Sequence, residues 1–198
     1  IAELVKKAMP VVNIILGGRE VSFGTRKYME DHPQVDFVFR GYGEMILFRF
    51  VKALLTYSFD FDRIGGLAYR ENDEIYVNDF PENMDYDKIP FPYEQEELTA
   101  RDQVYYQSFR GDADRCAYAQ VLPDRSISAL PLGRVCSELR YFLIKEVKSV
   151  TFVEKWFNYN VDRAYKIWDY LISNDNGVTK FIFDVNGDYL DEETVRLL

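Results

Sequence analysis

The chain has 198 residues, of which 47% are hydrophobic and 29% charged, a balance typical of one or two globular domains. Its net charge of −9 argues against nucleic acid as a partner, because a surface that follows phosphates needs clustered lysine and arginine. No apolar run approaches the roughly 20 residues that span a bilayer, so we expect no membrane partner. The 2 cysteines do not form a disulfide framework, which favours a cytoplasmic location.

The first part of the chain alternates between segments typical of helix and of buried strand. Apolar runs at 11–16 and 35–39 predict two buried parallel strands, each followed by glycines. Helices are expected over 1–8, where Pro10 ends the first, and from residue 44 to about 57. This order predicts parallel βαβ units. The side of the second helix expected to be buried comprises Leu47, Phe50, Val51, Leu54 and Leu55.

A hairpin and a linker are predicted next. Residues 66–70 and 74–77 flank a polar turn and have the pattern of paired strands. The following segment, 78–103, is rich in proline and acidic residues and shows no period, so we expect it to be a linker. It would separate a partial α/β domain, 1–77, from a second domain, 104–198.

The second domain repeats a strand–helix pattern. Strands are predicted at 104–109, 149–153 and 180–185, and helices at 131–148 and 160–173. Successive βα units suit the start of a β/α barrel, whose active site lies at the carboxyl ends of its strands. The loops leaving those ends are 110–119, 154–158 and 184–188. Because helical patterns run to both ends of the sequence, we expect a fragment of a longer protein.

The loop after the first of these strands carries the most specific motif. Arg110-Gly111 is followed by Asp112, Cys116 and Ala119 at spacings of four and three, with Tyr118 inside the last position. This resembles radical S-adenosylmethionine enzymes, in which a strand ending in Ser-Arg-Gly runs into Cys-x3-Cys-x-aromatic-Cys. The resemblance implies a 4Fe-4S cluster bound at positions 112, 116 and 119. It also implies S-adenosylmethionine as a cofactor, with Tyr118 beside its adenine.

Over essentially the whole chain, the order of segments resembles cobalamin-binding radical S-adenosylmethionine proteins. The matching segments are Gly17-Gly18 after a buried strand, 40–44, 64–70 and 89–93. The resemblance implies an α/β fold: the C-terminal part of a Rossmann-like cobalamin-binding domain, then the first βα units of a partial β/α barrel.

The same resemblance assigns cofactor-binding roles outside the cysteine loop. The backbone of Gly17 and Gly18 would approach the nucleotide tail of cobalamin, although glycine at a strand-to-helix turn has a conformational explanation too. Asp184, after the third strand, would contact the ribose of S-adenosylmethionine, the alternative being a cap of its own loop. The expected partners are small-molecule cofactors and the remainder of the barrel.

The ligand set departs from the family pattern. A cluster with one open iron needs three thiolates, and among the three positions only Cys116 supplies one. Asp112 offers a hard oxygen that binds this kind of iron less well, and Ala119 offers no donor. The remaining cysteine, Cys136, lies at helical spacing with apolar residues and is expected in the core. We therefore expect a protein deficient in the cluster.

Two classes of function fit these features of the sequence. The first is an enzyme of the radical S-adenosylmethionine lineage, generating a radical or transferring a methyl group to an unidentified substrate. The second is a non-catalytic α/β binding or scaffold module that keeps the family fold. An altered variant of a natural sequence would also explain positions 112 and 119.

Overall fold

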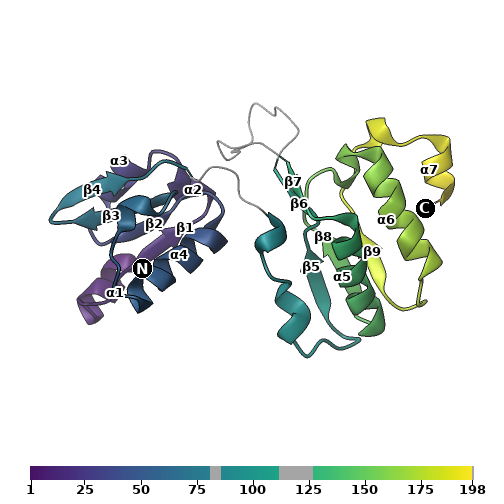
Figure 1. Cartoon of the computed structure of the whole chain (residues 1–198), viewed down its shortest axis with the longest axis horizontal. Helices are drawn as coiled ribbons and strands as arrows, with labels where there is room; N and C mark the ends of the chain where they lie inside the picture. Colours follow the sequence, from purple (N-terminus) through teal and green to yellow (C-terminus); the bar gives the residue numbers. More distant parts are fainter. Residues whose placement is uncertain (81–85, 112–126, 198) are drawn as a thin grey trace. The chain divides into compact units, whose positions relative to one another are not determined.

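The computed structural model describes residues 1–80, 86–111 and 127–197, which belong to two compact units (Figure 1). Residues 1–80 lie in the first unit, and the other two ranges lie in the second. Within the described residues, no helix combines the length and the apolar character needed to cross a bilayer.

The first unit contains a mixed sheet with the order β1-β2-β3-β4. Strand β1 (Ile15–Gly17) runs parallel to β2 (Phe37–Phe39), as predicted. The prediction of a buried strand over 11–16 is wrong in its bounds and burial, because β1 begins only at Ile15, which is 39% exposed, and Val11 is 92% exposed. Strands β3 (Leu67–Glu71) and β4 (Glu74–Val77) form the predicted hairpin, and β3 is antiparallel to β2. The residues of its turn, Asn72 and Asp73, have φ of 49° and 64°, a conformation that asparagine and aspartate tolerate better than most residues.

Helices cover both faces of this sheet. Phe37 and Phe39 on β2 pack with Ile46 and Phe50 of α4 (Gly43–Leu55), whereas Val38 between them packs with Met29 of α3 (Thr25–Asp31). The alternation follows from the two-residue period of a strand. The remaining helical segments are α1 (Ala2–Ala8), α2 (Arg19–Ser22) and the 3₁₀ turn η1 (Phe61–Arg63).

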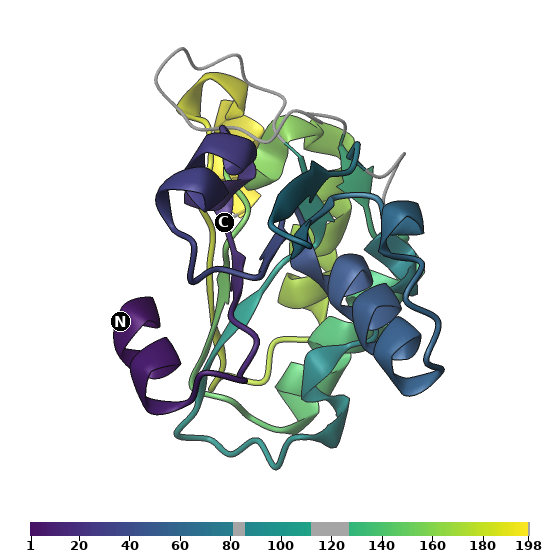
Figure 2. The ribbon, with the colours of Figure 1, turned by 90° about the vertical axis from the view of Figure 1, so that its left-hand side faces the viewer.

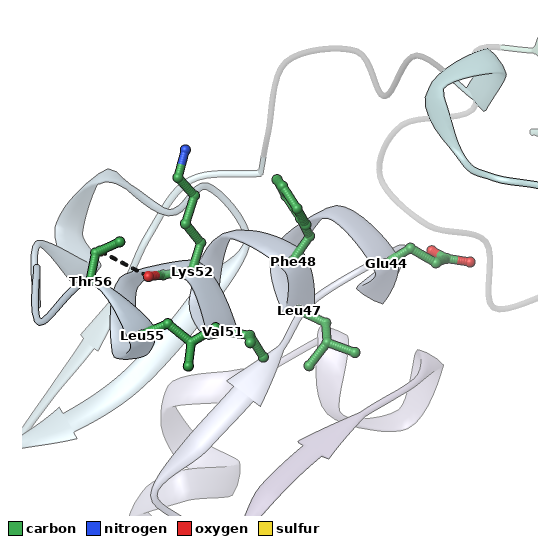
Figure 3. A pocket seen from close by; sticks show the side chains of 7 residues that line it. All are labelled: Glu44, Leu47, Phe48, Val51, Lys52, Leu55 and Thr56. Atoms are coloured by element: carbon green, nitrogen blue, oxygen red, sulfur yellow. Dashed lines mark hydrogen bonds between the residues drawn. The ribbon is translucent and has the colours of Figure 1, made fainter.

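The prediction for the buried side of α4 is wrong. Of the side chains expected there, only Phe50 is buried, while Leu47 and Leu55 are 49% and 75% exposed. Because α4 is apolar on nearly every side, its periodicity does not indicate which face meets the sheet. Leu47, Val51 and Leu55 lie along one side of the helix, and Phe48 and Lys52 point to another (Figure 3). These residues line an open hollow of about 500 Å³.

The second unit contains a parallel sheet with the order β5-β8-β9. Its strands are β5 (Gln103–Tyr106), β8 (Ser149–Phe152) and β9 (Lys180–Ile182). Helices α5 (Leu132–Ile144) and α6 (Val161–Ser173) lie on one face (Figures 1 and 2). The predicted series of βα units is confirmed, with α5 ending four residues before the expected position 148. This unit also contains a short antiparallel ribbon of β6 (Phe109–Arg110) and β7 (Ser128–Ala129). Its further helical segments include η4 (Phe157–Tyr159), η5 (Gly187–Tyr189) and α7 (Glu192–Leu197).

Aromatic side chains dominate the core of the second unit. Phe142 on α5 is fully buried, and its ring lies 5.2 Å from that of Tyr93 and 5.4 Å from that of Phe91. Both partners come from the segment in which we expected a linker, around the 3₁₀ turns η2 (Tyr86–Lys88) and η3 (Pro92–Gln95). From residue 86 onward, this segment therefore contributes to a packed core.

Replacing Phe142 with alanine should destabilise the second unit by about 3–5 kcal/mol, because a large buried ring is lost and a cavity remains. Urea unfolding followed by tryptophan fluorescence measures this, since both tryptophans, Trp156 and Trp168, lie in the second unit. The matched control is Ile144→Ala on the same helix, where the side chain is 68% exposed. A control effect as large as that of Phe142→Ala would contradict the assigned core.

Candidate functional site

The carboxyl ends of the parallel strands in the second unit come together around a buried carboxyl group. Strand β5 is interrupted after Tyr106, so the predicted strand 104–109 is divided, and Ser108 occupies the break. The backbone N–H and the hydroxyl of Ser108 both donate to Oε1 of Glu154, at 3.1 and 2.6 Å. Glu154 follows β8 by two residues. The interruption of one strand is thus coupled to the end of the next.

Glu154 is 3% exposed, which is unusual for a carboxyl group. Burial raises its pKa, and the hydrogen bonds from Ser108 and the positive charge of Arg163 oppose that rise. Nη2 of Arg163, on α6, donates to the carbonyl oxygen of Ser108 at 3.3 Å. The second oxygen of the carboxyl group, Oε2, has no hydrogen-bond partner among the described residues. Among the described residues it is a buried acceptor with unused capacity.

The loops after β8 and β9 are joined to each other. Asn158 is 1% exposed, donates to the carbonyl oxygen of Asn186 at 2.9 Å and accepts from the N–H of Asn186 at 2.8 Å. The N–H of Phe157 donates to the carbonyl oxygen of Asp184 at 2.7 Å. Trp156, just before this contact, has a φ of 57°, which is rare for a bulky side chain. These bonds hold the two loops in fixed positions at the edge of the sheet.

The glycine loops of the first unit form a second cluster. Gly18 has a φ of 103° and a ψ of 176°, a conformation that side chains disfavour. The buried hydroxyl of Ser22 donates to the carbonyl oxygen of Gly18 at 2.7 Å and accepts from the N–H of Gly41 at 2.9 Å. A Cβ added at Gly18 would meet no atom of the described residues within 4 Å, whereas one at Gly17 would lie 3.7 Å from the carbonyl oxygen of Phe39. The backbone of Gly18 is therefore open to close approach.

The structure places the predicted site residues unevenly. Gly17 and Gly18 lie in the glycine cluster, and Asp184 is exposed at the end of β9. Asp112, Cys116, Tyr118 and Ala119 lie outside the described residues. Within the described ranges, no group of three or more histidine, cysteine or acidic residues is placed to hold a metal ion.

Cys136 differs from its predicted environment. It is half-buried on α5 rather than enclosed in the core, because it lies beside the buried stripe of that helix rather than within it. Burial raises the pKa of its thiol, which reduces the fraction present as thiolate.

The sequence did not single out Ser108, Glu154 or Arg163. The only available signal was the position of Glu154 in the predicted loop 154–158, directly after an apolar strand. Its burial depends on residues 46 positions before it and on a helix after it, contacts that no local pattern reveals.

Comparisons with known proteins show which proteins the chain is similar to. No protein-family model matches the chain. Over 78 residues the chain is 38% identical to the anaerobic magnesium-protoporphyrin IX monomethyl ester cyclase of Cereibacter sphaeroides. This match covers 37% of the chain and 13% of that protein.

Solved structures match almost the whole chain. The radical S-adenosylmethionine methyltransferase TsrM from Kitasatospora setae, with tryptophan and an S-adenosylmethionine analogue bound, matches with a TM-score of 0.71 at 16% identity. That match covers 100% of the chain and 41% of TsrM. The cobalamin-dependent S-adenosylmethionine radical enzyme OxsB matches with a TM-score of 0.67 at 17% identity, over 98% of the chain and 30% of OxsB. The chain has the fold of part of these enzymes, and it spans less than half of their length.

The buried carboxyl group predicts a specific dependence of stability on pH. Because its pKa is raised, the folded protein retains a proton that the unfolded chain releases as pH rises past the ordinary value of 4.5. Rising pH through this window therefore lowers the free energy of unfolding of the unchanged protein. Glutamine does not titrate, so the Glu154→Gln variant lacks this contribution. The unfolding free energy of the variant minus that of the unchanged protein should therefore increase as pH rises from 4.5 to neutral. Urea titrations at several pH values measure this, and a constant difference would contradict the raised pKa.

Proposed function

We propose that the chain is part of a cobalamin-dependent radical S-adenosylmethionine enzyme. In this proposal, residues 104–198 begin the barrel and bind S-adenosylmethionine at the carboxyl ends of β5, β8 and β9. Residues 1–77 belong to the cobalamin-binding domain and border that cofactor through Gly17 and Gly18. The fold that the chain has in common with TsrM and OxsB supports both assignments.

The buried carboxyl group of Glu154 is the observation that carries the proposal. Its Oε2, which has no partner in the part of the chain that the structure describes, lies at the edge of a parallel sheet where α/β folds place their ligands. S-adenosylmethionine carries a cationic amine, and a cation beside this oxygen would stabilise the ionised carboxylate. Asp184 is exposed at the end of the neighbouring strand, where its carboxylate is accessible to the ribose hydroxyls of such a ligand.

The glycine cluster fits one edge of a cobalamin site. Cobalamin presents a long nucleotide tail, which needs close approach to backbone atoms, and the backbone of Gly18 has open space around it. The hydroxyl of Ser22 links the loops after β1 and β2, so both loops keep their positions at the same end of the sheet. Ligands of open α/β sheets bind at that end.

The residues present do not fit an ordinary iron–sulfur cluster. Positions 112, 116 and 119 supply one thiolate, and the other cysteine, Cys136, is on α5 with a thiol pKa raised by burial. Metal–sulfur sites of this type need deprotonated thiolates. We therefore assign no reaction step to a cluster in this chain.

This disagreement supports a second candidate, a binding module that keeps the scaffold without the radical chemistry. Such a module would retain the carboxyl-edge site around Glu154 and the glycine cluster. Iron analysis of the unchanged chain bears on the choice, because a full cluster would leave only the enzyme, whereas no cluster would favour the binding module.

Restoring the missing thiolates should restore the cluster. Anaerobic reconstitution of the unchanged chain should give iron and sulfide near zero, while the double variant Asp112→Cys/Ala119→Cys should give about four of each per chain. The single variant Asp112→Cys is the matched control and should remain near zero, because two thiolates do not complete the set. A full cluster in the unchanged chain would exclude the scaffold candidate, and none in the double variant would contradict the assignment of the loop.

A side chain at Gly18 should weaken cobalamin binding. Gly18→Val fills the open space beside the backbone, and equilibrium dialysis with cobalamin should show binding weakened by at least about fivefold. Gly24→Ala is the control for backbone strain, since Gly24 also has a positive φ of 57° and open space around it. If the unchanged chain retains no cobalamin, or both variants lose it equally, Gly18 does not border the cofactor.

A further inference from the structure

Strand β5 is an edge strand in the described part of the second unit, since it pairs with β8 on one side only. The carbonyl oxygens of Asp102 and Tyr106 accept hydrogen bonds from Lys148 and Val153 on the β8 side, both at 2.9 Å. Because backbone groups alternate along a strand, those of Tyr105 and Gln107 point to the opposite side. Unpaired groups of this kind are a template for another strand.

Two tyrosine hydroxyls occupy these outward-facing positions. The hydroxyl of Tyr93 donates to the carbonyl oxygen of Tyr105 at 2.8 Å and accepts from the N–H of the same residue at 3.1 Å. One side chain thus satisfies both backbone groups, as a neighbouring strand would do. The hydroxyl of Tyr86 donates to the carbonyl oxygen of Gln107 at 2.7 Å, one outward position further along.

Packing within the chain itself holds the rings of Tyr86 and Tyr93 in place. The ring of Tyr93 lies 5.7 Å from that of Phe91 and 5.2 Å from that of Phe142 in the core. Tyr86 is 7% exposed, and the guanidinium of Arg110 lies 4.5 Å from the centre of its ring. Because these rings are fixed by the core, their hydroxyls keep the edge bonded at little further entropic cost.

We propose that Tyr86 and Tyr93 act as a side-chain substitute for a neighbouring strand and prevent β5 from pairing with β5 of a second copy of the chain. The segment from Tyr86 to Gln95 then covers the edge of the sheet. Short charged edges and covering segments serve the same purpose in other β proteins. This segment does so with hydroxyl groups that bond particular backbone atoms of β5.

The test removes the hydroxyls and keeps the rings. In Tyr86→Phe/Tyr93→Phe the core packing is preserved, but the backbone groups of Tyr105 and Gln107 lose their partners. The matched control is Tyr141→Phe, whose hydroxyl donates to the carbonyl oxygen of Glu96 at 3.1 Å, close to the same aromatic cluster and away from β5. Sedimentation velocity over a concentration series measures self-association, and amide hydrogen exchange measures the protection of Tyr105.

The double variant should self-associate at concentrations about three- to tenfold lower than the unchanged chain and the control. At concentrations low enough for each protein to sediment as a single species, amide hydrogen exchange at Tyr105 should be faster by a similar factor in the double variant. The control should exchange as slowly as the unchanged chain. Equal association in all three proteins would overturn the proposal, as would association of the control to the same degree. Unchanged exchange at Tyr105 would also overturn it.

Discussion

The hydrogen bonds from Ser108 to the buried carboxyl group of Glu154 join the end of β5 to the end of β8. A buried carboxyl group is costly unless its oxygens are bonded, so this contact holds Ser108 at the break between β5 and β6. In the sequence, β6 follows Ser108 directly, and the motif at positions 112–119 comes after β6. Arg163 adds a bond from α6 to the carbonyl oxygen of Ser108, which ties helix, strand break and carboxyl group together.

This constraint relates the fold to the proposed chemistry. The carboxyl edge of the parallel sheet holds a buried acceptor, and the loops after β8 and β9 are fixed by the paired amide and backbone bonds of Asn158 and Asn186. A site built in this way is organised before a ligand arrives, which reduces the cost of binding. The chain has the fold of part of TsrM and OxsB, whereas positions 112 and 119 carry Asp and Ala and supply no thiolate.

The sequence predicted the elements better than their packing. Continuous apolar runs followed by glycines indicated the parallel strands, and the polar turn at Asn72 and Asp73 indicated the hairpin, because these signals are local. The packed face of α4 was mistaken because apolar residues surround that helix. Tyr86 and Tyr93 were hidden in a segment whose prolines and acidic residues suggested a linker, although their rings reach the core.

The candidate site was predictable as a place and less so as a set of residues. Parallel strands bring their carboxyl ends together, so the loops could be named in advance, but the burial of Glu154 depends on distant residues.

The central claim is that S-adenosylmethionine binds at the carboxyl ends of β5, β8 and β9. Hydrogen exchange of the chain with and without S-adenosylmethionine tests this claim most directly. We expect slower exchange in peptides covering 107–111, 153–158 and 183–188, and unchanged exchange in α4, which serves as the internal reference. Protection absent from all three peptides at saturating ligand would contradict it.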